Sequence, residues 1–197
     1  MVLIVITGLL AASVALTRSA AVAFLNVYLP VLLLLPDYYR WILPALPDPT
    51  FGEAALLPIA GVFVVKEFGR WRYSFTDLLI LGLAISMAYS EYLNAGYSDA
   101  QNLMFDMLGT IILPYMLAKG IIEPYGLSLA FARRLVFLLA VVAVIGLYEF
   151  RFGATPWQQL LHGFFPWQGG GWVTTFRWGF ARVAGPYGHA LLAGTIM

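Results

Sequence analysis

Long apolar runs separated by short polar stretches dominate this chain. A membrane-crossing helix needs about 20 apolar residues, within a range of ~17–25. Six runs fit this pattern, and they are Val2–Thr17, Ser19–Pro36, Phe51–Val65, Leu78–Leu93, Gln101–Ala118 and Leu127–Tyr148. Backbone polar groups within hydrocarbon must be hydrogen-bonded inside the chain, which favours helices. We therefore expect an all-α fold, a polytopic transmembrane helical bundle of six spans.

A seventh apolar run begins near Gly185 and meets the end of the sequence at Met197, before it could cross a bilayer. We therefore expect residues 1–197 to be a single membrane domain that forms the amino-terminal half of a longer protein. No Lys or Arg precedes the first run and a second run follows at once. This favours a retained membrane segment over a cleaved signal peptide.

The distribution of basic residues predicts the orientation of the bundle, because cytoplasmic loops are rich in Lys and Arg. The predicted cytoplasmic positions are Lys66, Arg70 and Arg72 after the third run, and Lys119, Arg133 and Arg134 around the start of the sixth. The stretches Asp37–Thr50, Tyr92–Ala100 and Glu149–Arg182 are then external. Counting crossings back from these loops also places the amino terminus outside. One kinked or re-entrant segment among the first two runs would place it inside instead.

The composition supports the membrane interpretation and narrows the chemistry. Of 197 residues, 61% are hydrophobic and 11% are charged, which excludes a soluble globular domain and a disordered chain. The net charge of +1 argues against nucleic-acid binding. Cysteine is absent and only two histidines are present, so we expect no disulfide and no metal centre. Nucleotide-binding and metal-hydrolase motifs are missing, so an enzyme here would use a lipid-borne donor without a dissociable cofactor.

The predicted external loop 149–182 is rich in tryptophan and arginine. It contains four of the six tryptophans, which are Trp157, Trp167, Trp172 and Trp178. Thr155 and Pro156 predict an N-cap followed by proline at the first helical position. We expect Pro156–Phe165 to be a short helix lying in the membrane interface. The tryptophans either anchor this loop at the interface or stack on sugar faces.

Arg151, Arg177 and Arg182 lie on the side that the positive-inside bias depletes. They are candidates to bind an anion, and snorkelling to lipid phosphates is the alternative. Asp106, in the fifth run, is a candidate functional carboxylate, or else a solvated or paired residue near the outer edge. Small residues expected to permit close helix packing are Gly61, Gly82, Ala84, Gly109 and Gly146.

The end of the chain carries a resemblance to a known family. After the tryptophan-rich loop, the sequence reads Arg182-Val-Ala-Gly185-Pro-Tyr-Gly-His189-Ala and enters an apolar run. This resembles the opening of the shared domain of the O-antigen ligase and O-antigen polymerase family, in which an Arg, a Gly and a His or Asn precede a membrane helix. The His of that family is usually followed by Pro or Asn, whereas Ala190 follows here. The stretches Tyr28–Asp37 and Ile42–Asp48 also look like the amino-terminal helices of bacterial exopolysaccharide members.

The resemblance implies an integral membrane glycosyltransferase of the bacterial inner membrane. It would transfer or polymerise glycan from an undecaprenyl diphosphate carrier at the outer face, without a metal. The alternatives are a transporter or flippase for a lipid-linked sugar or another anion, and a non-catalytic membrane scaffold.

The candidate site residues follow from this chemistry. Arg182 would stabilise the negative charge that develops on the departing diphosphate, with Arg177 or Arg151 as the second candidate. His189 would orient the donor or act as a base toward the acceptor hydroxyl. Gly185 would let the backbone approach a lipid phosphate. The remaining candidates for substrate binding are Tyr187 and Trp178.

Overall fold

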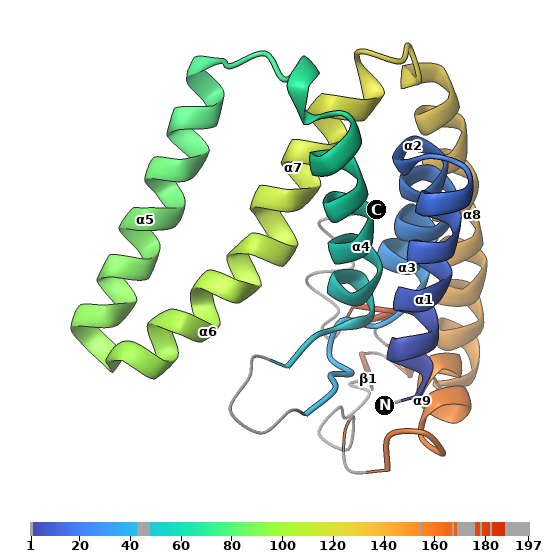
Figure 1. The fold of residues 1–197 in the computed structure, drawn as a ribbon. Coiled ribbons are helices and arrows are strands. Elements are labelled where there is room, and N and C mark those ends of the chain that lie inside the picture. The colour runs from blue at the N-terminus through green and yellow to red at the C-terminus, as the bar shows by residue number, and fades with distance from the viewer. Residues whose placement is uncertain are drawn as a thin grey trace.

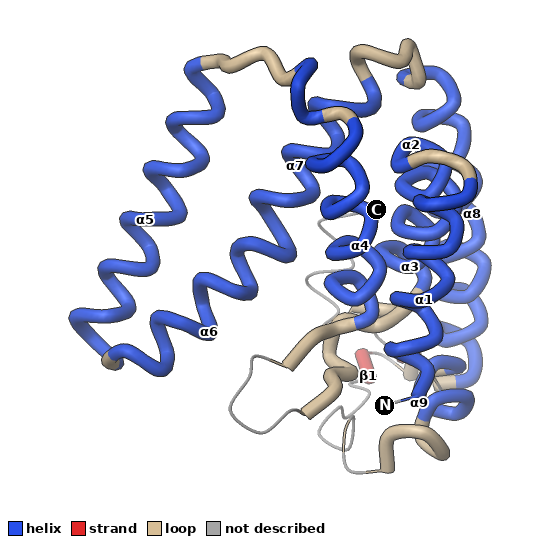
Figure 2. The backbone as a smooth tube through the Cα atoms, in the orientation of Figure 1, coloured by secondary structure: helices blue, strands red, loops and turns tan. Residues whose placement is uncertain are grey.

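The computed structural model describes residues 2–42, 48–153, 155–166, 168, 176–177, 179–181 and 183–187, without the side chains of Arg70 and Arg177. This part of the chain is mostly helical, and successive helices run back and forth between two ends of a bundle (Figure 1; Figure 2). The α1–α2 turn, the α4–α5 connection and the connection that enters α8 share the end at the top of Figure 1. The α5–α6 turn, α9 and β1 lie at the opposite end.

The first two apolar runs form a helical hairpin. Helix α1 (Val2–Thr17) ends where predicted, and the Ser19 hydroxyl then accepts a hydrogen bond from the Val22 N–H to cap the next helix. The return path is continuous through α2 (Ala20–Ala23), the π-helical turn η1 (Phe24–Tyr28) and α3 (Leu29–Leu34). The wide turn η1 comes directly before the helical segment that contains Pro30, whose ring crowds the preceding turn.

The remaining elements follow in chain order. They are α4 (Phe51–Lys66), the 3₁₀ turn η2 (Phe68–Arg70), α5 (Phe75–Ala95), α6 (Tyr97–Met107), the π-helical turn η3 (Leu108–Ile112), α7 (Leu113–Leu117), the π-helical turn η4 (Ala118–Ile122), α8 (Ser128–Phe152), α9 (Pro156–Leu161), β1 (Phe176–Arg177) and β2 (Phe180–Ala181). The path from α6 to η4 is one uninterrupted helix, Tyr97–Ile122. Strands β1 and β2 pair antiparallel as a small hairpin.

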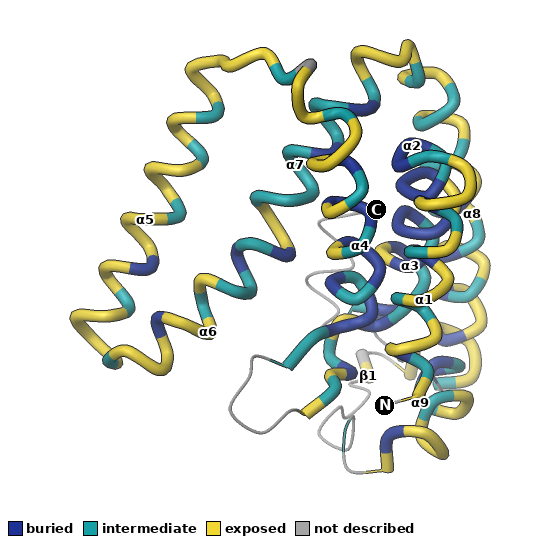
Figure 3. Tube along the Cα trace, in the orientation of Figure 1, coloured by how far each residue is buried: buried dark blue, intermediate teal, exposed yellow. Residues whose placement is uncertain are grey.

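The core lies where α1, the α2–α3 segment, α4 and the α7–η4 segment meet. Small side chains make this packing close, and Ala11, Ala15 and Ala55 are fully buried. The α5–α6 hairpin stands apart from the core, and α5 packs mainly against α6 (Figure 1). Ala88 is the buried residue of α5, and most of the other residues of this helix are exposed (Figure 3).

Three helices are long and apolar enough to cross a membrane, namely Phe75–Ala95, Tyr97–Ile122 and Ser128–Phe152. Large apolar side chains on their surfaces are exposed, as Val136 (68%) and Ile85 (66%) illustrate. Helices α1 and α4 have 16 residues each, or roughly 24 Å of helix against a hydrocarbon core of roughly 30 Å. Ala20–Leu34 is likewise a shorter apolar helix. Six spans of full membrane length are therefore not supported, and most of the seventh run lies outside the described residues.

The predicted packing glycines have different outcomes. A methyl group at Gly109 would come within 2.5 Å of Cγ of Glu53, so close packing there is confirmed. The same group at Gly61 or Gly82 would meet nothing within 4 Å, so that prediction is wrong for these two positions among the described residues. Both face outward because their helices are packed on one side only.

Candidate functional site

Glu149, near the carboxyl end of α8, is a fully buried carboxylate. It continues the buried stripe of that helix, which also contains Leu138, Val142 and Gly146 at helical spacing. A buried charge is costly unless hydrogen bonds compensate it. The hydrogen-bond donors around Glu149 therefore show which segments this carboxylate fixes at the end of α8.

Three donors surround the Glu149 carboxylate. Oε2 accepts a hydrogen bond from the N–H of Gly185 at 2.8 Å. Oε1 accepts from the N–H of Ala184 at 3.2 Å and from the hydroxyl of Thr155 at 3.3 Å. Hydrogen bonds to an ionised carboxylate are stronger than those between neutral groups. The carboxylate thus ties the segment that follows Arg182 to the end of α8.

The tied segment is a tight turn. Gly185 has a φ of +61°, which glycine adopts without strain, and the N–H of Tyr187 donates to the Ala184 carbonyl at 3.1 Å. Ala181 and Ala184 are both buried, on either side of position 182. The described residues on either side of Arg182 are therefore packed into the protein.

The β1–β2 hairpin packs on the same end of α8. Phe180 stacks on Phe150 with ring centroids 4.7 Å apart, and Arg177 pairs with Phe180 across the hairpin. A methyl group at Gly153 would come within 2.9 Å of the Phe176 ring. The hairpin thus places the backbone of Arg177 at the same end of α8 as the anchored turn.

Tyrosines border this site. Burial raises the pKa of the Tyr38 phenol, and the neighbouring Tyr39 and the Glu149 carboxylate raise it further. Burial also raises the pKa of Tyr187, whose hydroxyl has no hydrogen-bond partner among the described residues. Both phenols therefore keep their protons at neutral pH.

The predicted interfacial helix is shorter than expected and is docked on the bundle. Helix α9 ends at Leu161 and is followed by a turn, so the range Pro156–Phe165 was too long. The indole N–H of Trp157 donates to the carbonyl of Leu34. The ring of Phe165 packs against the ring of Tyr39, with their centroids 4.8 Å apart. Trp157 is thus buried in the protein, where it is shielded from both lipid and glycan.

The predicted side-chain cap at Thr155 is wrong. Pro156 does begin α9, but the Thr155 hydroxyl donates to Glu149 and does not cap the helix. The hydroxyl proton of Thr155 is directed to the buried carboxylate, and a hydrogen bond to an ionised carboxylate is stronger than one between neutral groups.

The structure gathers part of the predicted site at this end. Gly185 and Tyr187 belong to the anchored turn, and Arg151 lies exposed on the last turn of α8 with its guanidinium 5.8 Å from the Phe152 ring centroid. The Gly185 N–H is occupied by Glu149, so its contact with a lipid phosphate stays a prediction. Arg182, His189 and Trp178 lie outside the described residues.

A second polar cluster at this end involves Asp106. It pairs with Arg40 at 3.3 Å, and the amide side chain of Gln168 both accepts from the Arg40 N–H and donates to the Arg40 carbonyl, at 2.8 Å each. The expectation of a paired Asp is confirmed, whereas its place near the outer edge stays a prediction. Within the described ranges, no three acidic or histidine side chains form a group that could hold a metal ion.

Sequence reasoning missed Glu149, although the spacing of Leu138, Val142 and Glu149 on one helix face carried a signal for its burial.

Comparison with known proteins adds no identity, because no family model, no curated protein and no solved structure matches the chain. The described residues form a hydrogen-bonded backbone turn at one end of a helical bundle, the end that also holds the exposed Arg151 and the backbone of Arg177.

Proposed function

We propose that this chain belongs to a multi-pass protein of the bacterial inner membrane that transfers or polymerises glycan from an undecaprenyl diphosphate carrier at the outer face. The observation that carries the proposal is the buried Glu149, which fixes the backbone that follows Arg182. A preorganised cation stabilises developing negative charge better than a mobile one does. The anchoring therefore supports a role for Arg182 in transition-state stabilisation.

The proposed chemistry is breakage of the bond between the sugar and the diphosphate. Negative charge develops on the departing diphosphate, and Arg182 would hold its oxygens in a bidentate fork. Arg177 or Arg151 would supply a second cation from the same end of α8. His189 would orient the donor or take the proton from the acceptor hydroxyl.

The proposal includes six crossings of the membrane. The alternating direction of the helices supports it, since each connection with a predicted cytoplasmic charge cluster lies at the end opposite α9 (Figure 1). The shorter helices would be accommodated by local thinning of the bilayer and by snorkelling of flanking side chains. In this orientation the Glu149 site faces the outer side.

The test replaces Arg182 in the complete gene, expressed in its native host. We expect Arg182→Ala to insert normally and to cause carrier-linked glycan to accumulate, with Arg182→Lys less affected. Accumulated single repeat units would indicate a polymerase, and full-length chains a ligase. Arg133→Ala, an exposed arginine at the opposite end, serves as the control. Wild-type glycan in both Arg182 variants would contradict the proposal and favour a transporter or a scaffold.

A further inference from the structure

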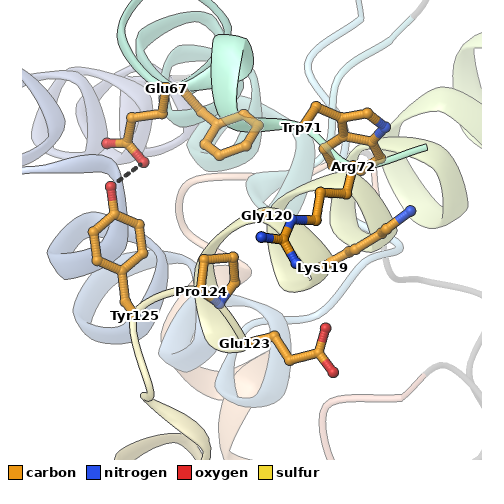
Figure 4. Close-up of a pocket in the computed structure, with 9 residues that line it drawn as sticks. Glu67, Trp71, Arg72, Lys119, Gly120, Glu123, Pro124 and Tyr125 are labelled. Atoms are coloured by element: carbon orange, nitrogen blue, oxygen red, sulfur yellow. Dashed lines mark hydrogen bonds between the residues drawn. The ribbon is translucent and has the colours of Figure 1, made fainter. Parts of the chain in front are cut away.

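A cavity of about 810 Å³ lies at the end of the bundle opposite the Glu149 site. It is formed where the carboxyl end of α4 and the segment after it meet the η4 turn (Figure 4). Its volume is within the range of roughly 300–1,000 Å³ that is usual for small-molecule sites. The charged and aromatic side chains that line it include Glu67, Trp71, Arg72, Lys119, Glu123 and Tyr125.

Two of these charges are already satisfied within the protein. The Lys119 ammonium pairs with the Asp77 carboxylate at 2.6 Å and lies 4.6 Å from the Trp71 ring centroid. Glu67 accepts a hydrogen bond from the Tyr125 hydroxyl at 3.1 Å, as Figure 4 shows. These contacts hold the walls of the cavity in place and reduce the charge that Lys119 offers to a ligand.

The other two charges remain open. Arg72 and Glu123 are exposed, and neither makes an ion pair with any described residue. They come from different segments, one after α4 and the other after η4, and both line the cavity (Figure 4). One free cation and one free anion in the same cavity match a ligand that carries both signs of charge.

The place of the cavity in the fold indicates a lipid. It lies at the ends of two helices that are long and apolar enough to cross a membrane, next to Trp71 and Tyr125, residue types that favour the interface. The exposed apolar surface of α5 begins beside it with Phe75 and Leu78, which are 73% and 66% exposed. Acyl chains could follow that surface while the headgroup enters the cavity.

We propose that this cavity binds the headgroup of phosphatidylethanolamine from the cytoplasmic leaflet. Arg72 binds the phosphate, and Glu123 accepts hydrogen bonds from the primary ammonium. Among the charged side chains that line the cavity, the carboxylates of Glu67 and Glu123 balance the cations Arg72 and Lys119, so a headgroup without net charge matches the lining better than one of net negative charge. A choline headgroup has no N–H to donate, so it satisfies Glu123 less well.

The proposal is tested by native mass spectrometry of the full chain with titrated lipids. We expect phosphatidylethanolamine to bind about tenfold more tightly than phosphatidylglycerol or phosphatidylcholine of the same chain length. Equal or tighter binding of either competitor would overturn the assignment. This comparison uses the unaltered protein, so it does not depend on whether any variant folds.

Variants then locate the site. Arg72→Ala and Glu123→Gln should each weaken phosphatidylethanolamine binding about tenfold, and Glu123→Gln should also reduce the preference over phosphatidylglycerol. The matched controls Arg133→Ala and Asp99→Asn alter exposed charges outside the cavity and should leave binding unchanged. If Arg72→Ala and Glu123→Gln bind phosphatidylethanolamine as the wild type does, the cavity is not the headgroup site. The glycan-transfer proposal would be unaffected by that result.

Discussion

Replacement of Glu149 by Gln removes the negative charge of the anchoring side chain and keeps its size and shape. The carboxylate accepts hydrogen bonds from three donors, on Gly185, Ala184 and Thr155. An amide keeps one acceptor oxygen and turns an NH₂ group toward the donors on the other side. At least one charge-assisted bond is therefore lost and a buried N–H or hydroxyl is left facing another donor. This costs about 2–3 kcal/mol, since each such bond contributes roughly 1.5–3 kcal/mol.

The cost falls on the docking of the turn 183–187, because α8 itself keeps its backbone hydrogen bonds. Hydrogen–deuterium exchange should show the amides of Ala184 and Gly185 opening roughly 30- to 150-fold more readily, while those in the middle of α8 are unchanged. Asp99→Asn, an exposed carboxylate at the same end, is the matched control. Exchange in Glu149→Gln that equals the control would refute the role assigned to this carboxylate.

Three further predictions concern other parts of the fold. Trp157→Phe removes the indole donor to the last carbonyl of α3 and should destabilise the docking of α9 by about 1 kcal/mol. Limited proteolysis should then cleave α9 faster than in the wild type, and an unchanged cleavage rate would show that the hydrogen bond is unimportant. Gly109→Ala should lower the thermal midpoint through a cost of about 1–3 kcal/mol, because its methyl group would overlap Glu53, whereas Gly82→Ala should have no such effect. In this cysteine-free chain, an impermeant maleimide should label Ser98→Cys in intact cells and Gly69→Cys only after permeabilisation; the reverse pattern would invert the orientation.

The positions of the helices could be predicted from the sequence because apolar runs are local signals. Val2–Thr17 is a helix with the predicted bounds, and the run at Leu127–Tyr148 lies within α8 except for Leu127, which is the N-cap of that helix. The number of full spans could not be predicted in the same way. Composition marks α1 and α4 as apolar, but their lengths fall short of the hydrocarbon thickness, and the core packing of these two helices is a tertiary property.

The candidate site was only partly predictable for a similar reason. Gly185 and Tyr187 belong to a recognisable motif, whereas the burial of Glu149 depends on contacts with residues 35 and 36 positions further along the chain. A carboxylate at the end of an apolar run looks solvated when the sequence is considered locally. Trp157 was misjudged as an interface residue because its acceptor, the Leu34 carbonyl, lies 123 positions away.

The central claim is that a lipid diphosphate binds at the outer face beside the turn held by Glu149. A single cysteine at Val183, introduced into this cysteine-free chain and reconstituted in liposomes, reports on that place directly. The account predicts that an impermeant maleimide labels Val183→Cys from the outer side and that undecaprenyl diphosphate slows the labelling, whereas undecaprenol does not. Labelling from the inner side alone, or labelling that undecaprenyl diphosphate leaves unchanged, would contradict it.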